Sequence, residues 1–383
     1  MNESIVEESM ATPSSRKRTW QYQSFPVALR WLWQGQRSIK ATNSCTKIGD
    51  HDRNWGGDAL NTTTISSSGQ PHILISTDLD GSLLSHEQYD MTGINVQIQA
   101  LSQMSMPVVF NSSKTIRECV HLQEALSLDA PFIAENGAAI VFREDDERFD
   151  FSKHSSEQLA SGKRIITLGT ELSHLLAFKY AYCPEAIDIV SGDGEALTRI
   201  TGLDEESLED ARDRQYSLPM VLDSAQYASL ETKAFDFGYR FEVGGRFKTL
   251  QGRHDKATAL ELVAAAYKRA ADGSVKLIGL GDAPNDQRML EACDVAVVVR
   301  REGCHHLMPQ AEKVIKTEFE APRGWIAGVE AALATLNRAS PLVDAPALHE
   351  KFKVLRARGN WSVDEASSSA PTPSILDTKE HGR

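Results

Sequence analysis

The sequence predicts an α/β protein whose parallel sheet is interrupted by an inserted α/β domain. Short apolar strands alternate with helical segments from about residue 71 to residue 340, which is typical of a parallel sheet with right-handed crossover connections. Between about residues 148 and 250, charged helical segments replace this pattern of strands and helices, and the pattern then returns. We therefore expect two core segments, 71–147 and 251–340, on either side of an inserted cap domain at 148–250.

The core elements are predicted from short apolar runs and from longer segments with helical periodicity. Buried strands are expected at 72–76, 107–110, 131–134, 275–279 and 295–299, and helices at 92–104, 116–128 and 257–271. In the inserted domain, the strand candidates are 234–237 and 239–241.

Both ends of the chain are predicted to be flexible extensions. Residues 1–70 are rich in Ser, Thr, Asn and Gly, and they show one short apolar stretch at 25–33. Residues 341–383 end in a Ser/Pro-rich polar tail, a composition that buries little apolar surface. We expect poor order in the N-terminal extension.

Composition excludes several classes of partner. The chain has 383 residues, with Lys+Arg 41 against Asp+Glu 53 and a net charge of −12. An acidic chain is a poor ligand for nucleic acid, which is bound through Lys and Arg. No apolar run approaches the ~20 residues that cross a bilayer, and the acidic start MNESIVEESM does not resemble a secretory signal. We expect neither a nucleic-acid partner nor a membrane partner.

The cysteines indicate a reducing compartment. There are five, an odd number, and no two form a C-x-x-C pair. A disulfide framework and a structural zinc site are therefore disfavoured. We expect a cytoplasmic protein.

Two carboxylates follow the first predicted strand. In STDLDGSLL, Asp78 and Asp80 lie two residues apart, so in an extended chain they point the same way. The carboxyl ends of strands are where open α/β sheets bind ligands. The competing interpretation is an acidic turn from strand to loop.

Two further signals lie at helix starts. Ser112, in NSSKT, follows the second strand, where hydroxyl and backbone N–H groups hold phosphate oxygens, although Ser is also an ordinary helix N-cap. Lys256, in GRHDKATAL, begins a helix and can place a positive charge beside a phosphoryl group; a lone lysine is more often a solvated surface residue.

The last signal is the string LIGLGDAPND. Here a strand ends in glycine, then Asp282, a Pro-Asn turn with Asn285, and Asp286. Oxygen ligands of this kind suit Mg²⁺, which needs few protein ligands. A turn with an N-capping aspartate is the alternative.

These four signals in this order resemble the haloacid dehalogenase superfamily of phosphotransferases. The insertion between the Ser and Lys signals resembles the superfamily's large α/β (C2-type) cap, and the core then resembles its Rossmann-like parallel sheet. The strings PFIAENGAAI, VGGRF and APRGWIAGV narrow the resemblance to the mannosyl-3-phosphoglycerate phosphatase family, over about residues 72–337.

The resemblance implies a role for each matched residue. Asp78 matches the nucleophile that forms an aspartyl-phosphate, and Asp80 matches the general acid/base. Ser112 matches the phosphate-binding hydroxyl and Lys256 the charge-balancing lysine. Magnesium ligands are implied at Asp78, Asp80 and Asp282, and supporting residues at Asn285 and Asp286.

Substrate contacts are implied by the same resemblance. Guanidinium groups bind carboxylates and phosphates bidentately, which suits Arg214 and Arg246, although each arginine alone would be read as a surface salt bridge. The implied substrate-binding residues are Lys114, Glu135, Asn136, Arg214, Gly245 and Arg246. The chain departs from the family pattern at Ser82, at Ala283 near the metal, and at Gln215 and Leu218 in the cap.

Together these features predict a Mg²⁺-dependent phosphatase that converts mannosyl-3-phosphoglycerate to mannosylglycerate and phosphate, in the biosynthesis of a compatible solute. The expected partner is a small phosphorylated glycoside. Alternatives are a glucosyl-3-phosphoglycerate phosphatase or another sugar-phosphate phosphatase of the superfamily, a phosphomutase, and a binding protein without catalysis. The last is disfavoured because all the core catalytic residues are present.

Overall fold

The computed structural model describes residues 72–85, 92–159, 162–244, 247–271, 273–301, 307–339 and 375–376. All of them belong to one compact unit, Ala41–Arg383. The predicted N-terminal extension, 1–70, lies outside the described residues, as do Gly245 and Arg246.

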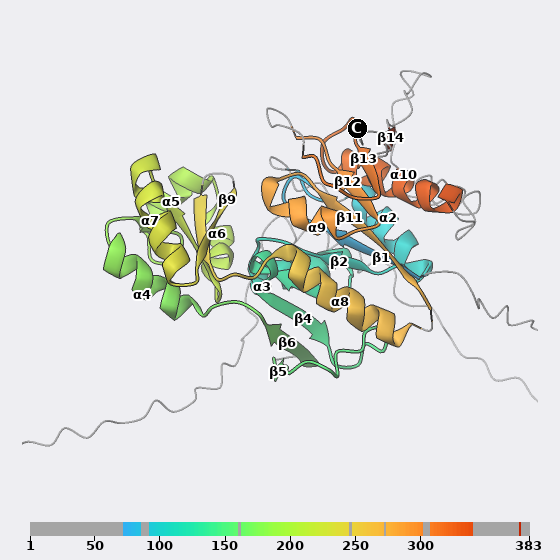
Figure 1. Cartoon of the computed structure of the whole chain (residues 1–383), viewed down its shortest axis with the longest axis horizontal. Helices are drawn as coiled ribbons and strands as arrows, with labels where there is room; N and C mark the ends of the chain where they lie inside the picture. Colours follow the sequence, from blue (N-terminus) through green and yellow to red (C-terminus); the bar gives the residue numbers. More distant parts are fainter. Residues whose placement is uncertain are drawn as a thin grey trace, which may run out of the picture. The chain divides into compact units, whose positions relative to one another are not determined.

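The main sheet has six strands in the order β14-β13-β12-β11-β1-β2 (Figure 1). Five of them run parallel, and only β14 is antiparallel to its neighbour. Their bounds are β1 His72–Thr77, β2 Val108–Phe110, β11 Val275–Gly281, β12 Val295–Val298, β13 Lys313–Lys316 and β14 Ile375–Leu376. This sheet confirms the predicted parallel α/β core.

Helices cover both faces of this sheet, because alternate residues of a strand point to opposite sides. On one face Leu74 of β1 packs in a buried cluster with Leu260 of α8 and Met289 of α9. On the other, Trp325 of α10 donates a 2.9 Å hydrogen bond to the Thr77 hydroxyl. The core helices are α2 Thr92–Gln103, α3 Ile116–Leu126, α8 Lys256–Ala270, α9 Gln287–Glu291 and α10 Arg323–Ala339.

A second, antiparallel sheet has the order β3-β4-β6-β5 and meets the end of β2 through a bridge between Asn111 and Ile133. Its strands are β3 Phe132–Ala134, β4 Ala139–Arg143, β5 Glu157–Gln158 and β6 Lys163–Thr167. Strands β5 and β6 fall within the range expected for the inserted domain, yet β6 pairs with the core strand β4, and β5 pairs with β6. Phe149 packs against Tyr267 of α8, and Phe151 packs against Phe149. We therefore propose that the cap begins after Thr167 and not at 148.

The third sheet lies within the insertion and has the order β7-β8-β10-β9. Its buried cluster joins Leu218 and Met220 of the sheet to Leu175 and Phe178 of a helix. The strands are β7 Ile187–Asp188, β8 Ser217–Val221, β9 Arg240–Gly244 and β10 Phe247–Gln251, and the helices are α4 Leu172–Tyr182, α5 Gly194–Thr201, α6 Glu205–Arg212 and α7 Ser224–Asp236.

The strand predicted at 234–237 is wrong, because Ala234–Asp236 form the last turn of α7. Asp223 caps this helix in a capping box with Gln226, which satisfies the free N–H groups of its first turn. Leu230 and Ala234 lie four residues apart and bury one face of the helix in the cap core. When the preceding helical turns are polar, four residues of alternating apolar and polar type fit a strand and the end of a helix equally well.

The C-terminal tail also differs from expectation. Within 341–383 the structure describes only Ile375–Leu376, which pair with Val314 and Ile315 as an edge strand. Two apolar residues are enough for this, since an edge strand needs only one hydrogen-bonding neighbour.

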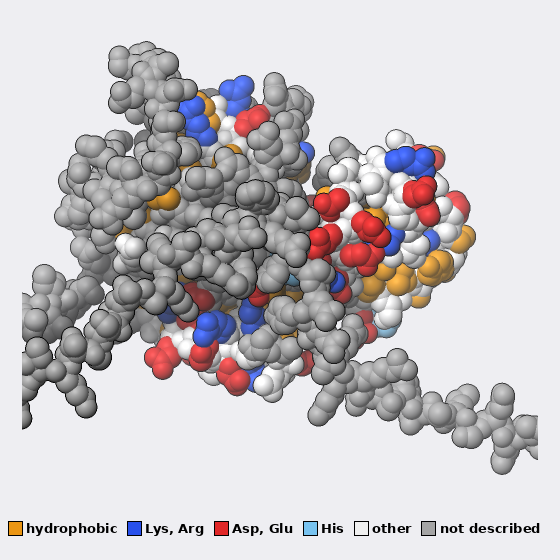
Figure 2. Space-filling view, turned by 180° about the vertical axis from the view of Figure 1, so that it is seen from behind, with side chains coloured by type: hydrophobic (Ala, Val, Ile, Leu, Met, Phe, Trp, Pro, Cys, Tyr) orange, Lys and Arg blue, Asp and Glu red, His pale blue; other side chains and the backbone are white. Residues whose placement is uncertain are grey.

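The surface carries the acidic character of the sequence. Acidic side chains gather on the face shown in Figure 2, and α6 opens with Glu205 and Glu206 in its first turn. Within the part of the chain that the structure describes, no helix has both the length and the apolar character that a bilayer crossing requires.

Candidate active site

The residues singled out in the sequence converge on the carboxyl edge of the main sheet. Asp78 follows β1, Ser112 follows β2, and Asp282 follows β11. These three strands are neighbours in the order β11-β1-β2 and run parallel, so their carboxyl ends meet. The backbone N–H of Asp78 donates to the Leu280 carbonyl at 2.9 Å, which ties the first motif to the last.

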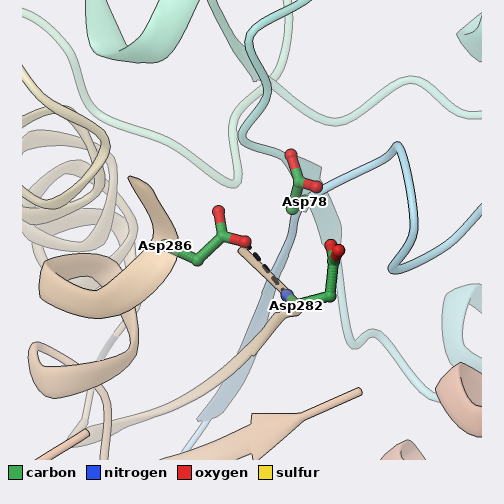
Figure 3. A group of neighbouring side chains, drawn as sticks. All are labelled: Asp78, Asp282 and Asp286. Carbon is green, nitrogen blue, oxygen red and sulfur yellow. Dashed lines mark hydrogen bonds between the residues drawn. The ribbon is translucent and has the colours of Figure 1, made fainter. Parts of the chain in front are cut away.

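Three buried aspartates form one group at this edge. Carboxylate oxygens of Asp78, Asp282 and Asp286 lie within 4.8 Å of one another, and their side chains converge on the same space (Figure 3). Asp286 is in the short 3₁₀ helix η3 (Pro284–Asp286), and its Oδ2 accepts the backbone N–H groups of Asp282 and Ala283, each at 3.0 Å. The Pro-Asn turn thus folds back on the strand end and brings the second aspartate beside the first.

Lys256 supplies the positive charge of the group. Its Nζ lies 2.6 Å from Asp78 Oδ1 and 2.7 Å from Asp286 Oδ1, and the side chain is 1% exposed. Burial lowers the pKa of Lys256, but the carboxylates of Asp286 and Asp78 outweigh burial and the pKa is raised. The solvated-surface interpretation of this lysine is therefore wrong, and its ammonium stays charged.

Burial has the opposite effect on the nucleophile candidate. Desolvation raises the pKa of Asp78 well above its ordinary value, and Lys256 offsets this only in part, while Asp286 and Asp282 add to it. Desolvation also raises the pKa of Asp286. Burial and mutual repulsion therefore oppose the ionised forms of Asp78 and Asp286, and further positive charge nearby would favour these forms.

Asp80 stands apart from this group. Its carboxylate is partly exposed and forms a 3.1 Å ion pair with Lys114, which also contacts Glu118 at 3.2 Å. Asp78, Asp80 and Asp282 remain the predicted metal ligands. The buried carboxylate group consists of Asp78, Asp282 and Asp286, and the Asp80 carboxylate is not part of it. The Asp80 side chain is thus left accessible for proton transfer.

Ser112 lies fully buried at the start of the loop between β2 and α3. The N-cap of α3 is Thr115, in a capping box with Glu118, so capping does not account for Ser112. The Ser112 hydroxyl accepts the Lys114 N–H at 3.2 Å, and its backbone N–H donates to Ile133. Lys114 is nearly buried beside it, so this loop sets a hydroxyl and a cation close to Asp80.

Glu135 connects the core to the cap. It is fully buried, and its carboxylate accepts hydrogen bonds from the backbone N–H groups of Gln215 and Tyr216 at 2.8 and 3.0 Å and from the Ser217 hydroxyl at 2.6 Å. Desolvation raises its pKa despite the opposing charge of Arg214. Because both oxygens are used in this way, we propose that Glu135 positions the cap and does not itself bind substrate.

Asn136 and Asn285 form a second tie across the site. Asn285 donates to Asn136 Oδ1, and Asn136 donates to Gln251 Oε1, both at 3.2 Å. Asn136 has a left-handed φ of 59°, and Gly137 follows with φ of 96°. A Cβ on Gly137 would lie 2.1 Å from the Asp255 carbonyl oxygen, so only glycine allows this close approach beside Lys256.

Arg214 reaches from the cap to the core. Its Nη1 donates to the Ser113 carbonyl at 3.1 Å and to the Ser217 hydroxyl at 3.0 Å, and its Nε donates to the Ala211 carbonyl. The surface salt-bridge interpretation does not describe these contacts. The other two expected cap residues, Gly245 and Arg246, lie outside the described residues.

The structure adds three residues to this site, of which the sequence had singled out only Ser82, as a departure from the family pattern. Ser82 donates to Asp282 Oδ1 at 2.9 Å, and Arg301 lies 3.2 Å from Asp282 Oδ2. Asn111 donates to the Lys256 carbonyl at 3.0 Å, while its own buried Oδ1 has no hydrogen-bond partner among the described residues. Arg301 had a signal, since it follows the apolar run of β12 just as the aspartates follow theirs.

Comparison with known proteins identifies the family of the chain. Residues 75–321 match the family described as haloacid dehalogenase-like hydrolase. The chain belongs to this family. This match confirms the predicted superfamily. It also confirms, at the level of the family, the prediction that the chain is an enzyme that hydrolyses phosphoric monoesters.

Three individual proteins that resemble this chain share less than 30% sequence identity with it. The glucosyl-3-phosphoglycerate/mannosyl-3-phosphoglycerate phosphatase of Persephonella marina is 28% identical over 270 residues, covering 70% of this chain and 99% of that protein. A solved phosphatase of the same superfamily from Bacteroides thetaiotaomicron is 19% identical, with TM-score 0.47, over 72% of this chain and 98% of that one. A solved Thermotoga maritima protein is 16% identical, with TM-score 0.45, over 69% and 97%.

Proposed function

We propose that this protein is a Mg²⁺-dependent phosphatase that hydrolyses mannosyl-3-phosphoglycerate to mannosylglycerate and phosphate. The observation that carries the proposal is the buried group of Asp78, Asp282 and Asp286 around Lys256. Carboxylate oxygens are the ligands that Mg²⁺ prefers, so the donor set fits this ion. When bound, the ion would offset the repulsion between a carboxylate nucleophile and a phosphate dianion.

The protein groups then have distinct tasks. A carboxylate oxygen of Asp78 attacks phosphorus, and the bond from phosphorus to the ester oxygen breaks. Asp80 gives its proton to the departing alkoxide and next takes a proton from the water that attacks the aspartyl-phosphate. Hydrolysis restores the Asp78 carboxylate and releases phosphate. Ser112 and Lys256 would hold phosphate oxygens throughout, since both lie at the same sheet edge.

The substrate class rests on the relative from Persephonella marina, whose name includes both the glucosyl and the mannosyl compound. A glucosyl-3-phosphoglycerate phosphatase is therefore the second candidate. Of the two cap departures from the family pattern, Leu218 is fully buried in the cap core, so it does not face a ligand. Gln215 uses its backbone N–H for Glu135.

A role in making a compatible solute, in the cytoplasm, is part of the same proposal. Cys119, Cys183 and Cys293 are free and buried, which fits a reducing compartment. The proposed partner is a small phosphorylated glycoside.

Phosphate release from the purified full chain tests the proposal. The panel is mannosyl-3-phosphoglycerate, glucosyl-3-phosphoglycerate, 3-phosphoglycerate and simple hexose phosphates, each with Mg²⁺. We expect the highest kcat/KM for a glycosylated phosphoglycerate. A higher value for hexose phosphates would contradict the substrate class, and isomerised sugar phosphate without free phosphate would indicate a phosphomutase.

Removal of the metal is a separate test. Excess chelator should abolish phosphate release, and added Mg²⁺ should restore it. Asp282→Ala removes one oxygen donor, and we expect ordinary Mg²⁺ concentrations not to rescue this variant. Full activity of the wild-type enzyme in chelator would refute the metal assignment.

A further inference from the structure

We propose that Arg301 is a positioning residue that occupies Asp282 before Mg²⁺ binds and so weakens the affinity of the free enzyme for the ion. This inference rests on the metal site of the proposed function. Its starting point is the 3.2 Å contact between Arg301 Nη1 and Asp282 Oδ2, where the Asp282 side chain is fully buried and Arg301 is 27% exposed.

The fold determines where Arg301 lies. Strand β12 pairs with β11, and the Val299 N–H donates to the Gly281 carbonyl at 2.9 Å, so the chain still runs beside β11 at the carboxyl edge. Consecutive residues of an extended chain point to opposite sides. Accordingly Arg300 turns away, with its Nη1 on the Glu318 carbonyl, while Arg301 turns toward Asp282.

Arg301 completes the charge pairing of the aspartate group. Lys256 contacts Asp78 and Asp286, and Arg301 contacts Asp282. Among the described residues, two cationic side chains therefore contact the three aspartates.

A divalent ion that binds the group must compete with this permanent charge. An ion that bound Asp282 Oδ2 would displace the Arg301 guanidinium. An ion that bound another oxygen of the group would still be repelled by the positive charge of Arg301. The pair is partly solvated, so the penalty is modest. We expect removal of the charge to tighten Mg²⁺ binding about 3- to 10-fold.

The experiment measures Mg²⁺ binding by isothermal titration calorimetry, on the full chain and in phosphate-free buffer. The variants are Arg301→Ala, Arg301→Gln and Arg301→Lys, and the matched control is Arg300→Ala. We expect tighter binding for Arg301→Ala and Arg301→Gln, and near wild-type binding for Arg301→Lys and for the control. The Gln variant decides the matter if the Ala variant does not fold.

Three results would overturn the inference. Equal or weaker Mg²⁺ affinity after loss of the Arg301 charge would show that the arginine does not compete with the ion. Equal tightening in Arg300→Ala would assign the effect to general surface charge. If the wild-type chain does not bind Mg²⁺, both this inference and the metal of the proposed function are refuted. If the wild-type chain binds Mg²⁺ but the variants do not show the expected differences in affinity, only this inference is refuted.

Discussion

Asp78 combines a buried carboxylate with a raised pKa, and the proposed chemistry needs that carboxylate ionised. Asp78→Asn replaces it with an amide, a very poor nucleophile, so nearly all phosphate release should disappear. Asp80→Asn removes proton transfer and should lower kcat by about 10²–10⁴-fold. Colorimetric phosphate release measures both variants.

Asp223→Asn is a matched control for these changes, because Asp223 caps α7 in the cap and asparagine is an equally good N-cap. It should leave turnover unchanged. Near-normal release by Asp78→Asn would show that no aspartyl-phosphate forms at this residue.

Lys256 stabilises the fold as well as the site. Its removal in Lys256→Ala leaves Asp78 and Asp286 buried without their cation, and loss of one partner of a buried pair typically costs about 3–5 kcal/mol. Urea unfolding in chelator should show a decrease of this order in the free energy of unfolding.

The comparison for this prediction is Lys276→Ala. Lys276 pairs with Asp294 at 2.6 Å, but both side chains are partly exposed, and such pairs contribute about 0–1 kcal/mol. Equal losses for the two lysine variants would mean that Lys256 is solvated in the protein.

Between elements, helix α3 of the core and helix α6 of the cap share a charged contact. Asp210 of α6 accepts from His121 Nδ1 at 2.8 Å and pairs with Arg117 at 2.7 Å, and the Thr115 hydroxyl donates to the Asp210 carbonyl. The hydrogen bond to Asp210 raises the pKa of His121, with Arg117 opposing this and Glu124 adding to it.

This contact predicts a pH dependence of stability. Because the pKa of His121 is raised above its ordinary 6.5, the stabilisation is complete below about pH 6.5 and is lost as pH rises through the raised pKa. Urea unfolding from pH 6 to pH 8.5 should show a falling free energy of unfolding. In His121→Gln this part of the slope should be absent.

His174→Gln is the matched control for comparison with the wild-type slope, because it removes a histidine from α4, which takes no part in the contact between α3 and α6. If His121→Gln also kept that slope, the contact between α3 and α6 would not be titrating in this range.

Across the whole molecule, we propose that selectivity for substrate comes from the cap, since the core motifs are common to many phosphatases. Arg214 is the described cationic residue of the cap that matches a family position, and it lies against Ser113, one residue from Ser112. A charge-assisted hydrogen bond to a glycerate carboxylate would contribute about 1.5–3 kcal/mol. Arg214→Ala should therefore lower kcat/KM for the glycosylated phosphoglycerate about 10- to 150-fold.

A small generic ester such as p-nitrophenyl phosphate lacks that carboxylate and should be affected far less. Arg199→Ala, on the exposed face of α5, is the control and should change neither substrate. Equal losses on both substrates would assign Arg214 to holding the cap against Ser113 and Ser217, and no loss on either would remove it from the site.

The parallel core was predictable because its strands are short apolar runs that each end in a chemical signal. Asp78, Ser112 and Asp282 were found in this way, since parallel strands place their carboxyl ends together. Lys256 was found through its position at a helix start. The helices and strands of the cap were harder to predict from the sequence, because they are polar and short and their periodicity is ambiguous, as α7 shows.

The sequence alone supplies the local signals and their order, which is enough to predict the family and the core of the candidate site. Which side chains touch depends on the tertiary structure. Three features of the site depend on contacts between residues far apart in the chain. The buried carboxylate group contains Asp286 and not Asp80, Glu135 connects the core to the cap, and Arg301 approaches Asp282. Local spacing carries no information about such contacts, because the packing of strands and the path of the insertion set them.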